Sequence, residues 1–217
     1  MKSITRAEAI RLIAVHDLKG LSSDERADEL YELSATDWED DPYWQQLPKS
    51  LRREIEEGEF NDIDDPSHAR FDQALMISMC ANYGLATNAY LLKMVKQLND
   101  KVCKITGVSQ SGISCPCCGL QTLEEREMYQ ICSVCWWEDD GQDNDDAHID
   151  AAGGPNKVSL TQGRINYLLH GICEPKRTDL IKLHEPTEKY AVGRKFMIDD
   201  TADIIYEVGA GWKTPLK

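Results

Sequence analysis

The sequence predicts an α+β protein in which a helical N-terminal domain, residues 1–110, precedes a cysteine-containing β-hairpin domain, residues 111–217. Three observations support this division. Apolar residues recur at helical spacing through the first region. Five of the eight cysteines lie within 21 residues of the second region. Residues 101–112 separate the two patterns and contain two glycines and two serines, as a linker does.

Capping signals and apolar periodicity predict the helices of the first region. Residues 5–8 and 22–25 each have the form of a capping box, with a helix continuing behind it. A third helix is expected near residues 48–58, with a proline in its first turn and Gly58 as its stop. The most apolar helices are expected at residues 65–83 and 87–98. Because both are apolar on more than one face, we expect them to form the centre of a helical bundle.

The cysteines form a pattern typical of a metal site. Cys115 with Cys118, and Cys132 with Cys135, make two C-x2-C pairs separated by 13 residues. Two tight turns of this kind supply four sulfurs at about 2.3 Å from one ion, in a tetrahedron. A cytosolic chain favours zinc over disulfides, so we expect one structural zinc ion per chain. Four thiolates leave no open position for water, so we expect no catalysis at this ion.

Other ligand sets remain possible on the sequence alone. Cys117 could replace Cys118, although Gly119 favours the turn that ends at Cys118. His148 is a weaker substitute ligand. A thioredoxin-like redox pair requires a βαβ context that the sequence lacks.

The rest of the second region predicts a zinc-ribbon-like β-hairpin. Residues 120–131, between the cysteine pairs, are expected to form its two short strands. A helix from Ser159 to Gly171 is expected to pack on the ribbon, because a ribbon alone has too little core. Residues 195–198 and 204–208 predict a C-terminal strand pair.

The charge is strongly acidic and unevenly distributed. The formal net charge is −14, from 24 basic and 38 acidic side chains. Residues 37–65 hold eleven acids and three basic residues, and residues 138–150 hold seven acids and no lysine or arginine. Phosphate backbones repel such a surface, so nucleic-acid binding is not expected. Because no apolar run reaches about 18 residues and the first residues lack the apolar core of a signal peptide, we expect a cytoplasmic protein outside the membrane.

The acidic segment 138–150 allows three interpretations. It could be a solvated loop, a surface for a basic partner, or an internal network in which aspartates bind turn amides. A calcium loop needs acids at alternating positions, glycine at position six and glutamate at position twelve. No register of this segment satisfies all of these requirements.

Several blocks of the second region occur together in one family. They are Cys115–Gly119, Ile131–Asp143, Gly153–Asn156, Val158–Leu160, Asn166 with Tyr167, and Glu185–Glu188. With these blocks, residues 113–190 resemble the bacterial cysteine-rich CPCC family. The resemblance implies a small zinc-binding module. Members of the family recur beside bacterial polymorphic toxins, which implies an immunity protein. The helical region and the residues past 190 lie outside the resemblance.

The sequence therefore predicts an immunity protein that neutralises a cognate toxin domain with a basic cleft. Acidic side chains would steer the toxin and aromatic ones would anchor it. The candidate contact residues are Trp38, Asp40, Asp41, Tyr43, Trp44, Trp136, Asp139, Asp140, Asp143, Asp145 and Asp146.

Two other functions remain as alternatives. A zinc-ribbon module in transcription or RNA handling would need a basic hairpin, but residues 120–131 hold one arginine and three glutamates. A metal-stabilised enzyme is the other. The sequence lacks G-x-S-x-G, a phosphate loop and H-E-x-x-H, so we expect no enzyme.

Overall fold

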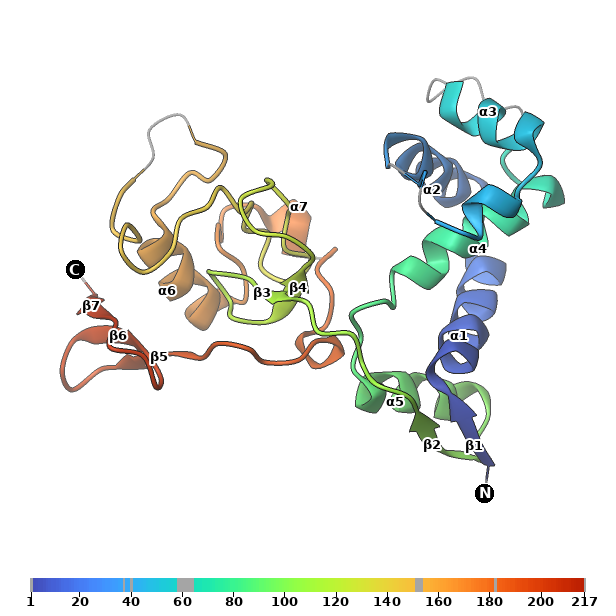
Figure 1. Ribbon diagram of the computed structural model, residues 1–217. Helices are drawn as coiled ribbons and strands as arrows, with labels where there is room; N and C mark the ends of the chain where they lie inside the picture. Colours follow the sequence, from blue (N-terminus) through green and yellow to red (C-terminus); the bar gives the residue numbers. More distant parts are fainter. Residues whose placement is uncertain are drawn as a thin grey trace. The chain divides into compact units, whose positions relative to one another are not determined.

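A computed structural model describes residues 2–36, 38–39, 41–57, 65–150, 154–181 and 183–216. The predicted helix stop at Gly58 and the candidate contact residue Asp40 lie outside these ranges. The chain is α+β, as predicted, and it divides into two compact units. Unit 1 comprises Met1–Gly84 and Leu91–Val108, and unit 2 comprises Leu85–Tyr90 and Ser109–Lys217 (Figure 1). No helix in the described ranges is long and apolar enough to cross a bilayer.

The first two helices of unit 1 begin at the predicted capping boxes. Helix α1 (Arg6–Gly20) follows Thr5, whose hydroxyl accepts a hydrogen bond from the backbone N–H of Glu8. Helix α2 (Ser23–Ala35) follows Ser22 in the same way. In both boxes the glutamate carboxylate accepts a hydrogen bond in return from the N-cap backbone. Two backbone donors that the helix leaves unpaired are thereby satisfied at each start.

The later helices of unit 1 also match the prediction, with one shifted start. They are α3 (Lys49–Glu57), α4 (Asp72–Ala81) and α5 (Asn88–Leu98), of which α5 continues from unit 2 into unit 1. The short 3-10 helices η1 (Trp44–Gln46) and η2 (Ala69–Phe71) were not predicted. Helix α4 begins seven residues after the predicted start at residue 65. The chain first makes the short turn η2, in which the His68 ring accepts a hydrogen bond from the Arg70 backbone.

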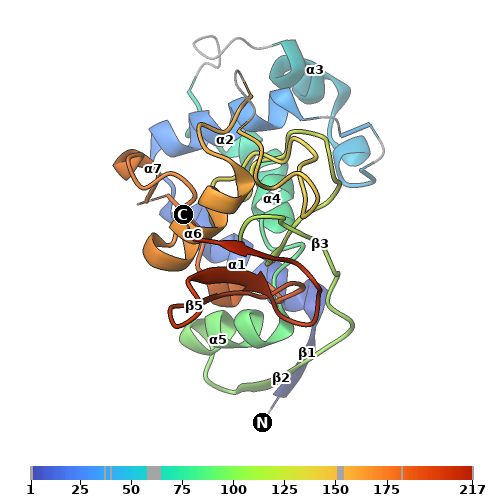
Figure 2. The same ribbon diagram turned by 90° about the vertical axis from the view of Figure 1, so that its left-hand side faces the viewer.

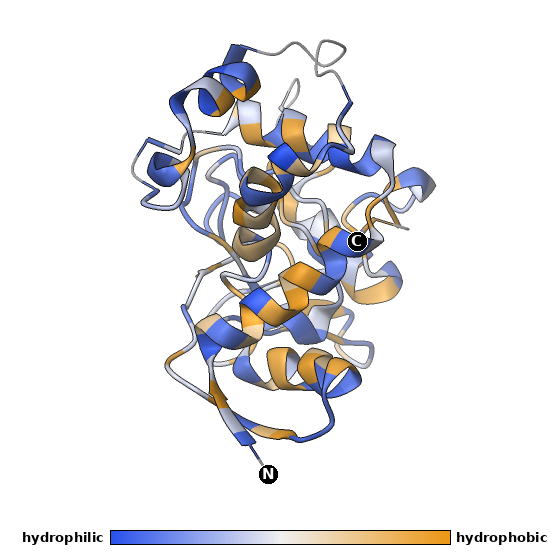
Figure 3. Cartoon of the chain, turned by 90° about the vertical axis from the view of Figure 1, so that its right-hand side faces the viewer, coloured by the Kyte–Doolittle hydropathy of each residue, from blue (hydrophilic) through white to orange (hydrophobic). Residues whose placement is uncertain are grey.

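The core of unit 1 lies where α2 packs against α3 and against α4. Apolar side chains from these helices and from η1 are buried there. Figure 3, coloured by residue hydropathy, shows hydrophobic (orange) and hydrophilic (blue) segments side by side along the helices. The buried members include Leu30, Leu33, Trp44, Leu47, Ile55, Phe71 and Leu75. This arrangement is the pattern expected of amphipathic helices around one core.

Unit 1 also contains a strand pair that the sequence analysis did not predict. Strand β1 (Lys2–Thr5) pairs in parallel with β2 (Val102–Thr106). Strand β2 occupies part of the predicted linker. It buries Val102 and Ile105, three positions apart, so it lacks the period-two alternation that identifies a half-buried strand.

The cysteine region of unit 2 differs from the predicted hairpin. Strand β3 (Ile113–Ser114) pairs with β4 (Gln121–Leu123) around the first cysteine pair, and Ile131 bridges to Glu138 around the second. Of the two strands predicted within residues 120–131, only one, β4, is formed. The reason is backbone geometry: Glu127 and Tyr129 have φ values of 65° and 58°, which strand pairing does not accommodate.

The C-terminal part of unit 2 confirms the predicted helix and strand pair. Helix α6 (Leu160–His170) begins at Ser159 and ends at Gly171, whose φ is 78°. After the short turns α7 (Thr178–Ile181) and η3 (Thr187–Lys189) come β5 (Phe196–Asp199) and β6 (Ile204–Glu207), with a third antiparallel strand, β7 (Lys213–Pro215). Helix α6 packs against β5 (Figure 2).

Candidate metal centre

Four buried cysteines converge in unit 2. The sulfurs of Cys115, Cys118, Cys132 and Cys135 all lie within 4.8 Å of one another. The Sγ atoms of Cys115 and Cys135 are 3.6 Å apart, and those of Cys118 and Cys132 are 3.7 Å apart. A tetrahedron with sulfurs at about 2.3 Å from its centre has edges of about 3.8 Å, so the four sulfurs fit one metal ion.

The local fold positions these sulfurs through two similar turns. The Gly119 N–H donates to the Cys115 carbonyl, and Gly119 adopts a φ of 79°, as the sequence predicted. The Trp136 N–H likewise donates to the Cys132 carbonyl, and Trp136 has a φ of 64°. The Thr122 hydroxyl donates to the Cys132 sulfur at 3.1 Å. A side chain that hydrogen-bonds a ligand atom in this way orients it for the ion.

The thiols influence one another's protonation. Burial raises the pKa values of Cys118 and Cys135, and the neighbouring sulfurs raise them further. Burial would also raise the pKa of Cys132, but hydrogen bonds from the other three cysteines and from the Cys135 backbone hold it well below its ordinary value. The cluster therefore favours the thiolate form of Cys132 and the thiol form of Cys118 and Cys135.

Two further thiols are buried but lie outside the set of four. Cys117 is fully buried and stands between the two ligands of the first pair. Cys173 is buried as well, and its N–H donates to the Cys135 carbonyl at 2.9 Å. The four sulfurs that converge include Cys118 and not Cys117. His148 is exposed and is not a member of the cluster.

Helix α6 lies directly on the first cysteine turn. Gly163 of this helix faces Trp137, which is fully buried, and Cys117. Arg164, also fully buried, donates from Nε to the Pro116 carbonyl at 2.8 Å. The helix thus holds the metal-binding turn by both close packing and a hydrogen bond.

The Gly163→Ala change tests this packing. A Cβ at this position would lie 2.9 Å from the Trp137 ring and 3.4 Å from the Cys117 sulfur. Because a buried ring has little room to shift, we expect the free energy of unfolding to fall by about 1–3 kcal/mol. Chemical denaturation followed by tryptophan fluorescence measures the loss. Gly20→Ala is the control, since its Cβ would meet nothing within 4 Å; an equal effect of both changes would contradict the close packing.

The acidic segment after the second cysteine pair is largely an internal network. Asp143 accepts hydrogen bonds from Arg126 at 3.0 Å and from Arg194 Nη1 at 3.1 Å, and it forms ion pairs with the Nη2 atoms of Arg194 at 2.8 Å and of Arg164 at 3.6 Å. Asp139 is fully buried and accepts from Arg126 at 2.8 Å. The structure therefore fits the interpretation of this segment as an internal network, in which aspartate side chains bind groups of their own chain. It does not fit a purely solvated loop.

The other candidate contact residues of unit 2 differ in their exposure to solvent. Asp140 and Asp146 are half-buried and accept hydrogen bonds from the N–H groups of Gln142 and Asp143. Trp136 is half-buried beside the cysteine core. Asp145 alone is exposed. The prediction of a continuous acidic contact patch at residues 138–146 is thus not supported, because most of these carboxylates bind groups of their own chain.

Sequence reasoning missed the arginines that complete this network. Arg194 binds Glu207 with two hydrogen bonds of 2.8 Å, and Asn144 donates to the same carboxylate. The Arg194 guanidinium holds the pKa of Glu207 below its ordinary value of 4.5, although burial opposes this. No spacing in the sequence marks these partners, because they come from distant segments that only the fold brings together.

Glu207→Gln provides a test with a defined pH dependence. Because the folded-state pKa of Glu207 is lowered, its stabilisation is complete above the unfolded value near 4.5 and is lost as the pH falls through the folded value. We expect the variant to be less stable than the wild type by about 1–2 kcal/mol at pH 7. The difference should shrink below about pH 4. Urea unfolding of both proteins from pH 7 to pH 3.5 measures it, and a gap that is constant with pH would contradict the ion pair.

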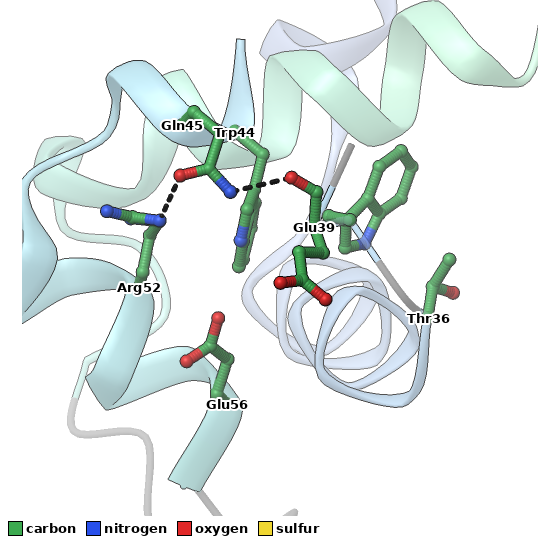
Figure 4. A pocket seen from close by; sticks show the side chains of 7 residues that line it. Thr36, Glu39, Trp44, Gln45, Arg52 and Glu56 are labelled. Atoms are coloured by element: carbon green, nitrogen blue, oxygen red, sulfur yellow. Dashed lines mark hydrogen bonds between the residues drawn. The ribbon is translucent and has the colours of Figure 1, made fainter. Parts of the chain in front are cut away.

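Unit 1 has a separate acidic and aromatic pocket of about 500 Å³. Trp38 and Trp44, with ring centroids 6.3 Å apart and stacked, form part of its wall. Figure 4 shows the carboxylates of Glu39 and Glu56 pointing into the same space, with Arg52 turned toward Gln45. Its lining comprises Thr36, Trp38, Glu39, Trp44, Gln45, Arg52 and Glu56.

Of the candidate contact residues of unit 1, those that the structure describes are Trp38, Asp41, Tyr43 and Trp44, and they lie in or beside this pocket. Trp38 is half-buried and Trp44 is almost fully buried, so only part of each indole can reach a partner. Tyr43 is 65% exposed. Asp41 is half-buried, and it accepts hydrogen bonds from the N–H groups of Tyr43 and Trp44, which fixes the turn that carries them.

In unit 2, two knuckle-like turns bring together four cysteines that could hold a metal ion. The family of this region follows from comparison: residues 113–189 match the family described as Cysteine-rich CPCC. The resemblance predicted from the sequence is confirmed for this part of the chain. No curated protein and no solved structure matches the chain.

Proposed function

We propose that the protein is an immunity protein, a non-catalytic binder that neutralises a cognate bacterial toxin domain. The observation that carries this proposal is the pocket of unit 1, which Trp38 and Trp44 line and into which the carboxylates of Glu39 and Glu56 point. Two carboxylates and an aromatic face are the groups that recognise a guanidinium or ammonium group. Such groups line the basic clefts of proteins that act on nucleic acids.

The character of the metal centre supports a binding role. Four protein sulfurs complete a tetrahedral site, so no position remains at which a substrate or water could be activated. The ionic network around Asp143 is likewise used within unit 2. We propose that the ion is zinc, one per chain, because thiolates favour zinc and the protein is proposed to act in the reducing cytoplasm.

Co-expression with the toxin domain encoded beside the gene tests the proposal. We expect cells that produce both proteins to survive, and the purified pair to bind with an affinity that falls as salt rises. Glu39→Gln with Glu56→Gln should weaken binding, whereas Glu57→Gln, on the same helix as Glu56 but outside the pocket, should not. A chain that neither protects cells nor binds the toxin domain would rule out this function.

A zinc-ribbon module that binds nucleic acid is the alternative. The arginine between the cysteine pairs, Arg126, is engaged by Asp139 and Asp143, which leaves the glutamates of that segment facing solvent. This charge argues against the alternative. Salt-dependent binding of DNA or RNA in a gel-shift assay would favour this alternative over the immunity function.

A further inference from the structure

Large apolar side chains are exposed in the loop between the two cysteine pairs. Residues 124–131, here called the inter-pair loop, lead from β4 to the second pair (yellow-green in Figure 1). Met128 is 62% exposed, Tyr129 60% and Ile131 53%. Exposed apolar residues scattered singly are ordinary, but three within four positions of one loop form a candidate contact surface.

Hydrogen bonds to the buried residue Asp139 hold the inter-pair loop in place. This carboxylate accepts from the Arg126 side chain at 2.8 Å and from the Glu127 N–H at 2.9 Å, and its backbone carbonyl accepts from the Tyr129 N–H at 3.0 Å. The Gln130 side chain accepts from the N–H groups of Glu124 and Glu125. The acidic segment that the sequence assigned to a partner surface is therefore a support for this loop.

The backbone of the loop fixes how these side chains are displayed. Glu127 and Tyr129 are both in the left-handed region, which non-glycine residues seldom adopt. Such conformations persist where the surrounding structure holds them in place. Here Asp139 accepts hydrogen bonds from the N–H groups of Glu127 and Tyr129, and its own N–H donates to the Gln130 carbonyl. A loop that is already ordered loses little conformational entropy when it binds, so its apolar side chains can contribute fully to affinity.

The charge around the apolar residues indicates the kind of partner. Glu124, Glu125 and Glu127 are exposed, whereas the only basic residue of the loop, Arg126, is directed into the network. An acidic rim around apolar side chains complements an apolar pocket bordered by lysine or arginine. The same rim, in a chain of net charge −14, disfavours a second copy of the chain and a nucleic acid.

We propose that Met128, Tyr129 and Ile131 form a pre-organised docking element that inserts into an apolar pocket, bordered by basic residues, on a protein partner. The proposal extends the proposed function by naming a second contact, in unit 2, for the same class of partner. It does not require that the partner be a toxin.

Site-specific photocrosslinking in the producing cells tests the proposal. With p-benzoylphenylalanine in place of Tyr129, irradiation is expected to yield one discrete adduct with another protein, identified by mass spectrometry. The adduct should disappear when Met128→Ser and Ile131→Ser are added. The same probe in place of Leu169, which is 63% exposed on α6, is the matched control and should give no such adduct.

The outcomes separate this proposal from the proposed function. An adduct with a toxin domain supports both, and a loop-dependent adduct with a different protein supports the docking element while it contradicts the immunity function. No adduct, an adduct that survives the double change, or an adduct with a second copy or a nucleic acid overturns the docking element. Unchanged metal content of the double variant shows that its loss of crosslinking is not unfolding.

The identified partner then allows a quantitative check. Isothermal titration calorimetry with the purified pair should show that Met128→Ser with Ile131→Ser weakens binding about 30-fold or more, the size typical of central anchors. Glu125→Lys should lower the association rate and its dependence on salt. Leu169→Ser should leave the affinity unchanged, and an equal loss in this control would overturn the assignment.

Discussion

Replacement by serine of any one of Cys115, Cys118, Cys132 or Cys135 is expected to abolish metal binding and to unfold the cysteine region of unit 2. The four sulfurs share one site, and the metal-binding free energy of such a site, about 10–16 kcal/mol, is part of the folding free energy. This exceeds what a small domain retains as net stability, so the site cannot be removed without loss of structure. Metal content by mass spectrometry and the fluorescence of buried Trp137 report the two effects.

Two other cysteines serve as controls for this experiment. Cys103→Ser, at an exposed position of β2, should change neither metal content nor folding. Cys117→Ser alters a buried thiol outside the four, so we expect full metal content and a loss of about 1–2 kcal/mol of stability. If Cys118→Ser instead retained the ion while Cys117→Ser lost it, the assigned ligand set would be wrong.

The parts of this fold that the sequence predicted are those encoded by local signals. The capping boxes at Thr5 and Ser22, the end of α6 at Gly171 and the C-x2-C spacing each depend on residues within a few positions of one another. Local hydrogen bonds and turn conformations decide such features, and they leave a readable pattern. The sequence did not predict strands β1 and β2, because their pairing joins residues about 100 positions apart.

The acidic segment shows where local patterns fail. Its composition left open a solvated loop, a surface for a partner and an internal network, whereas in the structure Asp139 is fully buried and Asp143 binds two arginines. Whether an aspartate faces solvent or an arginine depends on which distant segments fold over it. The arginine partners lie 17 and 51 positions from Asp143. The exposed apolar residues of the inter-pair loop were not identified either, because the sequence predicted two short strands over residues 120–131 and the left-handed conformations of Glu127 and Tyr129 prevent the second.

Arg164 joins the parts of unit 2 that lie far apart in the sequence. Its guanidinium lies between the rings of Phe196 and Trp212, at 4.2 and 4.3 Å from their centroids. It also donates to the Pro116 carbonyl in the first cysteine turn and to Asn144 in the acidic segment. Burial and the nearby Arg194 lower the pKa of Arg164 to about 10, so it remains charged at neutral pH.

Arg164→Met is therefore expected to cost about 3 kcal/mol of stability, because it removes one partner of a buried charged network and leaves the Pro116 carbonyl without its donor. Arg164→Lys should restore only part of this loss. A lysine keeps the charge, but it lacks the planar guanidinium that contacts both rings and donates from two different nitrogens to two acceptors.

Urea unfolding at saturating metal and the rate of metal loss to a chelator measure these effects. Both variants should lose metal faster than the wild type, with methionine the faster, because the turn that carries Cys115 and Cys118 is then held by fewer contacts. Arg177→Met is the control, since Arg177 pairs with Asp179 at the surface and should have no measurable effect. Equal metal-release rates in the wild type and Arg164→Met would mean that α6 and the C-terminal sheet do not support the metal centre.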